Sequence, residues 1–173
     1  NTRKGVERCI RFAFEYCRKR NKDKKLTLCG KTNVLTYAFD LWERVFDEMA
    51  GEYPDIQTDY AHVDAICMWM VKNPEWFDVI VTDNMFGDII SDIAAMITGS
   101  LGMLPSASLG SEHALYEPVH GSAPDIAGKN MANPIAMISS VAMMFAHSYQ
   151  MTKAAEVIEE GIARALSHGY RTQ

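Results

Sequence analysis

Hydrophobic positions along the chain follow two different spacings. Apolar residues recur at helical spacing over residues 2–20, 35–49, 65–71, 86–98, 131–149 and 152–167, and this pattern predicts six helices. Short apolar runs bounded by turn residues predict strands over residues 26–29, 58–63 and 77–82. Because strands alternate with helices, we expect an α/β protein in which at least part of the sheet is parallel.

Residues 99–128 follow neither spacing. The segment is rich in glycine, proline and serine, and its pattern predicts no helix or strand. A connection of this length without secondary structure is uncommon in a compact domain unless it is functional. We therefore expect an irregular segment that takes part in binding.

Composition narrows the class of protein. Hydrophobic residues make up 48% and charged residues 23%, as is typical of a soluble globular protein, and the net charge of -5 argues against nucleic acid as the main partner. No apolar run is long enough for a membrane-spanning helix. The four cysteines (Cys9, Cys17, Cys29 and Cys67) form no CxxC pair, which favours reduced thiols in a cytoplasmic protein.

Two acids stand one helical turn apart in DNMFGDIISDI, directly after the strand predicted over residues 77–82. Asp88 and Asp92 have i,i+4 spacing, so their side chains project from one face of a helix. Open α/β sheets bind ligands beyond the carboxyl ends of their strands, and paired carboxylates suit Mg²⁺ or Mn²⁺. Alternatively, Asp88 favours the helix N-terminus and Asp92 is solvated. Spacing alone leaves both interpretations open.

Two further polar residues stand at the ends of predicted strands. Asp64 ends a strand in HVDAICM, and an isolated acid at such a position is usually a helix cap. Lys31 follows a strand in CGKTNVL, where a lysine is usually a solvated surface charge. A lysine near other cations or a metal can lose its proton, so Lys31 is also a candidate base.

The segment LYEPVHGSAPDIAGKNMANP, residues 115–134, contains few large apolar residues that could pack in a hydrophobic core. Its glycines permit close approach to a ligand, and its Asp and Asn side chains can bind ribose hydroxyls or an adenine edge. An ordinary ordered surface loop is the alternative. The chain contains neither GxGxxG after a strand nor GxxxxGK[ST], so no common nucleotide-binding motif supports the functional interpretation.

Several stretches together resemble the β-decarboxylating dehydrogenase family: KTNVL, HVDA, VTDNMFGDIISD, GSLGMLPSASLG and EPVHGSAPDIAGKNMANP. They are collinear with the family's motifs over essentially the whole chain. The family comprises 3-isopropylmalate, isocitrate, homoisocitrate and tartrate/D-malate dehydrogenases. FGDIISD and GSLGMLPSASLG most resemble the isopropylmalate branch, which serves leucine biosynthesis.

The resemblance implies oxidation of a (2R)-hydroxy acid that carries a 3-carboxylate, followed by loss of CO₂, with NAD(P)⁺ and Mg²⁺ or Mn²⁺ as cofactors. Asp88 and Asp92 match the family's metal ligands in one subunit, and Asp64 matches the ligand from the neighbouring subunit. Lys31 matches the general base, which also reaches across the homodimer, and Asn33 matches the asparagine near the nicotinamide.

The resemblance also assigns a cofactor loop. The matching positions are His120, Gly121, Ser122, Ala123, Asp125 and Asn133. Asp125 occupies the position at which NAD-specific members bind the adenosine ribose. An anion there repels a 2′-phosphate, so the resemblance favours NAD over NADP.

The family's arginine-rich substrate segment and catalytic tyrosine lie upstream and are not in this sequence. We therefore expect part of an isopropylmalate dehydrogenase-like fold, truncated at both ends, with a mixed or parallel sheet and flanking helices. Residues 1–98 are expected to belong to the smaller substrate and dimerisation domain, and residues 99–173 to the cofactor domain. Such a chain carries half an active site and is expected not to turn over alone. From another class, it could be a binding or dimerisation module.

Overall fold

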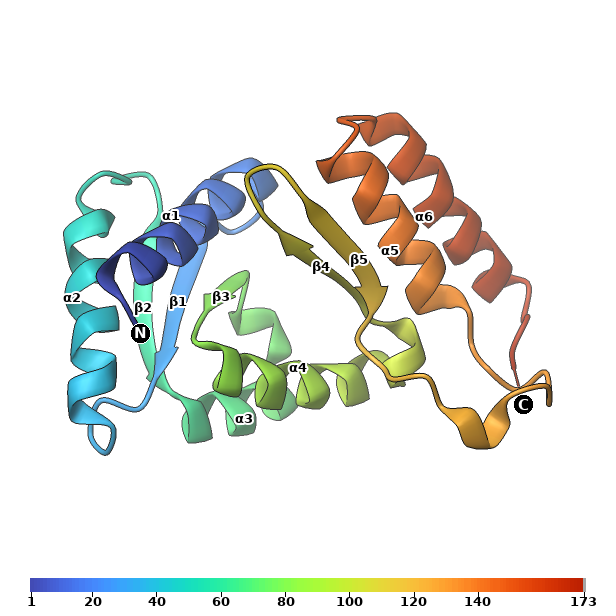
Figure 1. Cartoon of the computed structure of the whole chain (residues 1–173), viewed down its shortest axis with the longest axis horizontal. Coiled ribbons are helices and arrows are strands. Elements are labelled where there is room, and N and C mark those ends of the chain that lie inside the picture. Colours follow the sequence, from blue (N-terminus) through green and yellow to red (C-terminus); the bar gives the residue numbers. More distant parts are fainter. Residues whose placement is uncertain (173) are drawn as a thin grey trace. The chain divides into compact units, whose positions relative to one another are not determined.

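The chain folds into two compact units, Asn1–Ala94 and Ala95–Gln173 (Figure 1). The computed structural model describes residues 1–172. The boundary falls inside a continuous helix, α4 (Asn84–Thr98), whereas the sequence prediction places it after residue 98.

Unit 1 is built on a three-stranded sheet with the strand order β2-β1-β3, and both pairings are parallel. The strands are β1 (Lys25–Gly30), β2 (Gln57–His62) and β3 (Val79–Val81). Its helical elements are α1 (Arg3–Arg20), α2 (Thr36–Ala50), α3 (Val63–Lys72), the short 3-10 helix η1 (Pro74–Trp76) and most of α4. The predicted α/β class with a parallel sheet is confirmed.

The core of unit 1 is one cluster of buried residues from the sheet and from the helices α1, α2, α3 and α4. The central strand β1 is buried over residues 26–30, which explains its nearly continuous apolar run. Ile10, Phe14 and Cys17 recur at helical spacing on α1 and are fully buried. Phe14 stacks on Phe46 of α2, with 5.4 Å between the ring centroids. Helical periodicity thus produces the predicted apolar face.

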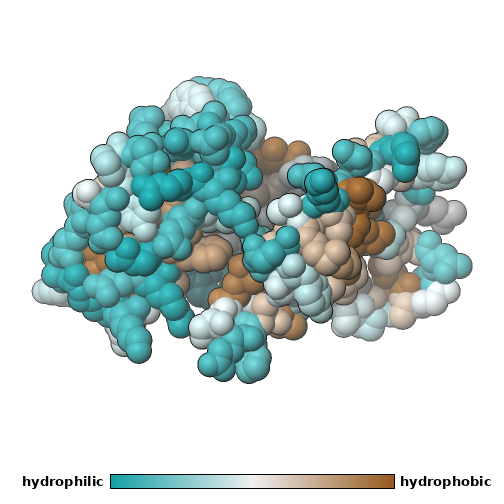
Figure 2. Space-filling model, turned by 90° about the horizontal axis from the view of Figure 1, so that it is seen from above, coloured by the Kyte–Doolittle hydropathy of each residue, from teal (hydrophilic) through white to brown (hydrophobic). Residues whose placement is uncertain are grey.

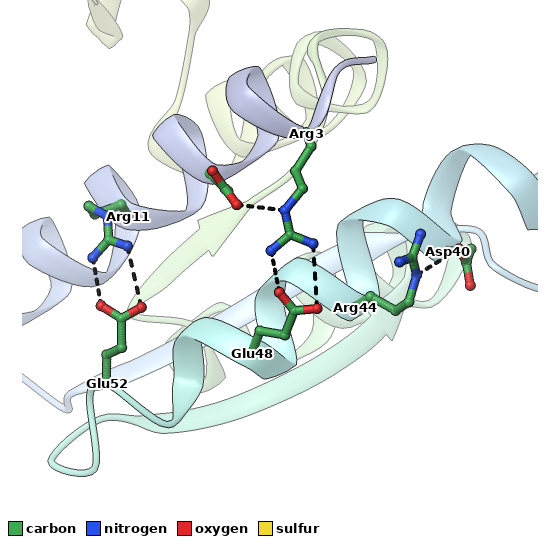
Figure 3. Close-up of polar contacts among 7 residues, drawn as sticks. Arg3, Arg11, Asp40, Arg44, Glu48 and Glu52 are labelled. Atoms are coloured by element: carbon green, nitrogen blue, oxygen red, sulfur yellow. Dashed lines mark hydrogen bonds and ion pairs between the residues drawn. The ribbon is translucent and has the colours of Figure 1, made fainter.

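Arginine–carboxylate pairs join α1 to the end of α2 and to the loop that follows it (Figure 3). The arginines are spaced along one face of α1, and two hydrogen bonds join each of three pairs: Arg3–Glu48, Arg11–Glu52 and Arg18–Asp55. In each pair the arginine's hydrogen bonds lower the pKa of the carboxyl below its ordinary value. Seen from above Figure 1, the surface over α1 is accordingly mostly hydrophilic (Figure 2).

These pairs predict a specific pH dependence of stability. The ordinary pKa values are 4.5 for Glu and 3.8 for Asp, and the folded values are lower, so the stabilisation is complete above these values. This stabilisation is lost as pH falls through the lowered pKa values.

We expect the combined variant Glu48→Gln, Glu52→Gln, Asp55→Asn to be less stable than the wild type at pH 6. Urea unfolding should show this difference vanishing in acid, and high salt should reduce it at pH 6. Glu156→Gln with Glu160→Gln, which alters two exposed acids of α6 (Thr152–Ser167), is the control. An unchanged difference in acid would contradict the assignment.

Unit 2 contains an antiparallel hairpin of β4 (Pro105–Leu109) and β5 (Ala114–Pro118). The helix α5 (Ile135–His147) packs against both strands and against α6. Buried Ser140 on α5 donates a hydrogen bond to the Glu117 carbonyl of β5 at 3.0 Å. The remaining elements are the 3-10 helices η2 (Leu101–Met103) and η3 (Pro124–Ile126). Brown patches in Figure 2 mark apolar residues at the surface of this unit.

Two predictions for unit 2 are wrong. Residues 99–128 are not irregular throughout, because they contain the β4–β5 hairpin and two 3-10 helices. The strands read PSASL and ALYEP, so small and turn-forming residues hide their pattern. The helix predicted from residue 131 begins at Ile135. Pro134 precedes it, and the Asn133 side-chain oxygen accepts a hydrogen bond from the Ile135 N–H at 3.0 Å.

The cysteines and the membrane prediction can be checked directly. All four cysteines are free thiols. Cys29 is buried at the end of β1, and burial raises its pKa to about 11, so its thiol is poorly reactive. Among residues 1–172, no helix combines the length and the apolar character that crossing a membrane requires.

Candidate active site

Lys31 and Asp64 meet at the carboxyl end of the parallel sheet. β1 and β2 pair in register up to Gly30 and His62, so the residues that follow each strand emerge side by side. Lys31 directly follows β1, and Asp64 lies in the first turn of α3. Lys31 Nζ is 2.5 Å from Asp64 Oδ1, and the two side chains are 21% and 69% exposed.

The structure places neither residue in the simpler role that its sequence position suggests. Asp64 is not a helix cap, because α3 has His62 at its N-cap and no side-chain cap hydrogen bond. Lys31 is not a freely solvated charge, because its ammonium is paired. The hydrogen bond from Lys31 lowers the pKa of Asp64, and backbone hydrogen bonding lowers it further. Asp64 is therefore ionised at neutral pH.

The two acids of α4 lie beyond the end of β3. Asp83 provides the cap of this helix, since its Oδ1 accepts a hydrogen bond from the Phe86 N–H at 3.0 Å. No acid lies in the first turn, so the interpretation of Asp88 as a residue of the helix start is wrong. Asp88 accepts a hydrogen bond from the Asn84 side chain at 3.2 Å. Both Asp88 and Asp92 are exposed.

The donor set of α4 fits a hard divalent cation. Asp88 and Asp92 project from one helix face, and within residues 1–172 no Lys, Arg or His lies within ion-pair distance of either. Nor do any three His, Cys, Asp or Glu side chains of the described residues gather into a metal site. A single chain therefore does not bring Asp64 together with Asp88 and Asp92.

Asn33 belongs to the turn that carries Lys31. The Lys31 carbonyl accepts hydrogen bonds from the Val34 and Leu35 N–H groups at 3.1 and 2.8 Å, which closes the turn. Asn33 is exposed, and its side chain makes no hydrogen bond within the described part of the chain. Its amide is therefore available to a ligand.

The predicted cofactor loop lies between β5 and α5. The His120 ring is hydrogen-bonded through Nδ1 to the Gly121 carbonyl at 2.8 Å. Ala123 has a φ of 43°, a left-handed conformation that starts the turn of η3 and leaves Asp125 exposed. A Cβ at Gly121 would meet nothing within 4 Å, so packing inside the chain does not require glycine there. Neighbouring Ser122 is exposed.

Asn133 lies at the far end of this loop and has structural contacts of its own. Its oxygen accepts the Ile135 N–H at the start of α5, and its Nδ2 lies 3.5 Å from the Met103 sulfur. Its Cβ stands 2.9 Å from the point where a Cβ on Gly102 would lie. One amide hydrogen remains for a ligand. Asn133 also borders an apolar groove of about 950 Å³ between α5 and α6, which His120 and Asp125 do not line.

Sequence reasoning missed four polar residues around the Lys31–Asp64 pair and the start of α4. They are Thr32, Tyr60, His62 and Asp83. The position of Asp83 directly after a strand was the available signal. Tyr60 and His62 are two residues apart on β2, so their side chains lie on the same face of the strand. This spacing does not indicate their hydrogen-bond partners.

Comparisons with known proteins found a matching family and similar sequences. The profile of the family described as isocitrate/isopropylmalate dehydrogenase matches residues 1–173. The 3-isopropylmalate dehydrogenase of Chlorobaculum tepidum is 55% identical over 167 residues, which cover 96% of this chain and 47% of the relative. That of Aquifex aeolicus is 52% identical, with 99% and 46% covered.

A solved structure is also similar. The isocitrate dehydrogenase from Methylococcus capsulatus superposes with a TM-score of 0.94 at 47% identity, and the match covers 99% of this chain and 50% of that one. The chain thus spans about half the length of the relatives that it matches. A family profile that matches from end to end, together with a shared fold at high identity, decides the classification. The chain belongs to the isocitrate/isopropylmalate dehydrogenase family.

Proposed function

We propose that this chain is part of a dehydrogenase that uses NAD and Mg²⁺ or Mn²⁺ to decarboxylate a 2-hydroxy acid oxidatively. The observation that carries the proposal is the pairing of Lys31 Nζ with Asp64 Oδ1 at 2.5 Å, beyond the carboxyl ends of β1 and β2. An exposed pair of carboxylates, Asp88 and Asp92, follows the neighbouring strand β3. Each chain thus presents the base with one carboxylate and, separately, the carboxylate pair of α4, and a second copy is needed to bring the two sets together.

Each group has a role in this chemistry. When bound, the cation polarises the substrate hydroxyl and stabilises the negative charge that develops on loss of CO₂, while NAD accepts the hydride. Asp88 and Asp92 would hold the cation from one subunit, and Asp64 would supply a third carboxylate from the other. With Asp64 turned to the cation, Lys31 would be released from this pair, and in its neutral form its Nζ would take the hydroxyl proton. Asn33 lies on the same turn, where it can bind the nicotinamide.

The exposed faces of α3 and α4 support a homodimer with shared sites. Met68 and Val71 of α3, and Met85 and Ile89 of α4, are all about half exposed or more. Met85, Ile89 and Asp92 have i, i+4, i+7 spacing, so the metal ligand lies on the same stripe as the apolar residues. A second copy that covered this stripe would bring its Lys31 and Asp64 to the carboxylates.

The proposed substrate is 3-isopropylmalate, which places the enzyme in leucine biosynthesis and in the cytoplasm. The relatives from C. tepidum and A. aeolicus, named 3-isopropylmalate dehydrogenase, are 55% and 52% identical to this chain, against 47% for the solved isocitrate dehydrogenase, and this supports the choice over isocitrate, homoisocitrate or tartrate/D-malate. A panel of these hydroxy acids assayed with the complete gene product tests it. The highest kcat/KM for 3-isopropylmalate is the expected result, and a higher value for another acid would reassign the substrate.

The role of these residues is tested in a chimera in which residues 1–173 replace the matching segment of the C. tepidum relative. We expect the chimera to reduce NAD with 3-isopropylmalate and Mn²⁺. The 173-residue chain alone is expected to show no turnover, although it should keep its fold. An inactive but folded chimera would count against the proposal.

A purely binding or dimerising module is the second candidate, since exposed apolar helix faces alone suffice for association. Calorimetric titration of the chimera with Mn²⁺ and NAD separates the two. Binding of both ligands together with turnover supports the enzyme, whereas a stable dimer that binds neither supports the module.

We assign unit 1 to the substrate and dimerisation domain and unit 2 to the cofactor domain.

Asp125 is proposed to select NAD. Its carboxylate is exposed and has no ion-pair partner within residues 1–172, so it would repel the 2′-phosphate of NADP. Asp125→Asn in the chimera is expected to lower the preference for NAD over NADP, measured as the ratio of kcat/KM values, by at least about tenfold. Asp23→Asn, remote in sequence and exposed, is the control. An unchanged ratio would remove Asp125 from cofactor selection.

A further inference from the structure

The hydroxyl of Tyr60 joins the two segments that carry Lys31 and Asp64. Tyr60 lies on β2, and its Oη accepts a hydrogen bond from the Thr32 backbone N–H at 3.1 Å. It also contacts Thr32 Oγ1 at 2.9 Å and His62 Nδ1 at 3.1 Å. Thr32 follows Lys31 directly, and His62 stands two residues before Asp64.

These three contacts use the full capacity of the hydroxyl, which has one donor and two acceptor sites. One acceptor site takes the Thr32 N–H. The phenol then donates either to His62 Nδ1 or to Thr32 Oγ1 and accepts from the other. Either arrangement leaves no site for water, so the hydroxyl has a fixed position.

The ring of Tyr60 is held against the end of β1. A Cβ on Gly30 would lie 3.1 Å from both Tyr60 Cε2 and Oη, and 2.9 Å from Phe39 Cδ1. Only glycine permits this approach. Tyr60 and His62 are also in edge-to-face contact, with 5.3 Å between ring centroids. The phenol ring thus packs against both Gly30, which precedes Lys31, and the His62 ring.

Backbone pairing between the two segments ends at Gly30 and His62. Beyond that point, the described structure links them through the Lys31–Asp64 pair and the Tyr60 hydroxyl. The first link is exchangeable, since both side chains must turn to substrate and cation during the proposed reaction. The second does not depend on either side chain and can persist.

We propose that Tyr60 is a positioning residue, whose hydroxyl fixes the Lys31 turn against the start of α3 so that base and carboxylate are presented together. The positioning role given to Tyr60 rests on the proposed function. The first test below does not, because it requires no enzymatic activity. Tyr60→Phe removes the hydroxyl and keeps the ring. Tyr116→Phe, which breaks a 2.7 Å contact with Ser148 in unit 2, is the matched control.

The first test uses NMR on the 173-residue chain without metal, cofactor or substrate. In Tyr60→Phe, hydrogen exchange of the Thr32 amide is expected to rise about fivefold, as for one lost hydrogen bond. The Lys31 Cε methylene should become as mobile as those of exposed lysines, measured by its order parameter. Tyr116→Phe should change neither. If Tyr60→Phe proves unstable, Thr32→Val removes one of the three contacts and should give the same changes to a smaller extent.

The second test uses the chimera, where Tyr60→Phe is expected to lower kcat about tenfold with the substrate KM within about twofold, since misplacement of a catalytic group lowers the rate more than binding. Faster Thr32 exchange with an unchanged Lys31 side chain and unchanged kcat would mean that the hydroxyl only stabilises the turn, and would overturn the inference. The NMR result can be obtained whether or not the chimera is active. Failure of the proposed function can therefore be distinguished from failure of this inference.

Discussion

Replacing Lys31 with methionine in the chimera is expected to lower kcat at least about a hundredfold, because a positioned general base contributes about 10²–10⁴ in rate. Methionine has a similar length and no basic nitrogen, so the change removes the base with little loss of packing. Asp64 loses its partner, but it is 69% exposed and can be hydrated. Steady-state kinetics with saturating Mn²⁺ and NAD provides the measurement.

The matched control is Lys22→Met, which removes an exposed ammonium whose nearest carboxylate, Asp23, is 3.9 Å away. Its kcat should equal that of the unmodified chimera. The midpoint of urea unfolding should be nearly the same in both variants, because exposed pairs contribute at most about 1 kcal/mol. A Lys31→Met variant that retains more than about a tenth of the rate would exclude Lys31 as the base.

Removing one carboxylate from α4 is expected to abolish metal binding at working concentrations. Loss of a residue that merely orients a metal ligand costs about 10–100-fold in affinity, so Asp88→Asn or Asp92→Asn should raise the Kd for Mn²⁺ more than about a hundredfold. Asparagine keeps the shape of the side chain and removes the charge. Calorimetric titration of the chimera with Mn²⁺ measures this, and excess Mn²⁺ should restore part of the activity.

Asp40→Asn is the control for this pair. Asp40 is an exposed acid of α2 that pairs with Arg44 at 2.9 Å one turn away. Its loss should leave the Kd for Mn²⁺ unchanged. If Asp88→Asn and Asp92→Asn both bind Mn²⁺ as tightly as the parent, the two acids are solvated surface residues and the assignment of the metal site is wrong.

Much of unit 1 could be predicted from periodicity, because its elements are long or strongly apolar. The helix predicted over residues 152–167 in unit 2 also has the bounds of α6. The β4–β5 hairpin could not be predicted, because its strands contain serine, alanine and proline instead of β-branched residues. The start of α5 was predicted too early, although Asn133-Pro134 is a recognisable start signal.

Part of the candidate site could likewise be predicted from the sequence, and part could not. Spacing alone placed Asp88 and Asp92 on one helix face, and family motifs assigned their roles. The contact between Lys31 and Asp64 was not predictable, because it depends on the register of β1 and β2, which α2 separates in sequence. The contacts of Tyr60 with Thr32 and His62 depend on the same register. Pairing of parallel strands is a property of the fold and leaves no local signal.

The central claim is that each active site combines Asp88 and Asp92 of one subunit with Lys31 and Asp64 of the other. It is tested most directly by a hybrid dimer of two inactive chimeras, Lys31→Met and Asp92→Asn, co-expressed with different affinity tags and purified through both. In a two-fold symmetric dimer, one of the two sites then contains only wild-type residues, so kcat per dimer should be about half that of the parent. If each site were built within one chain, both sites would carry a substitution, and a hybrid no more active than the two parent variants would contradict the claim.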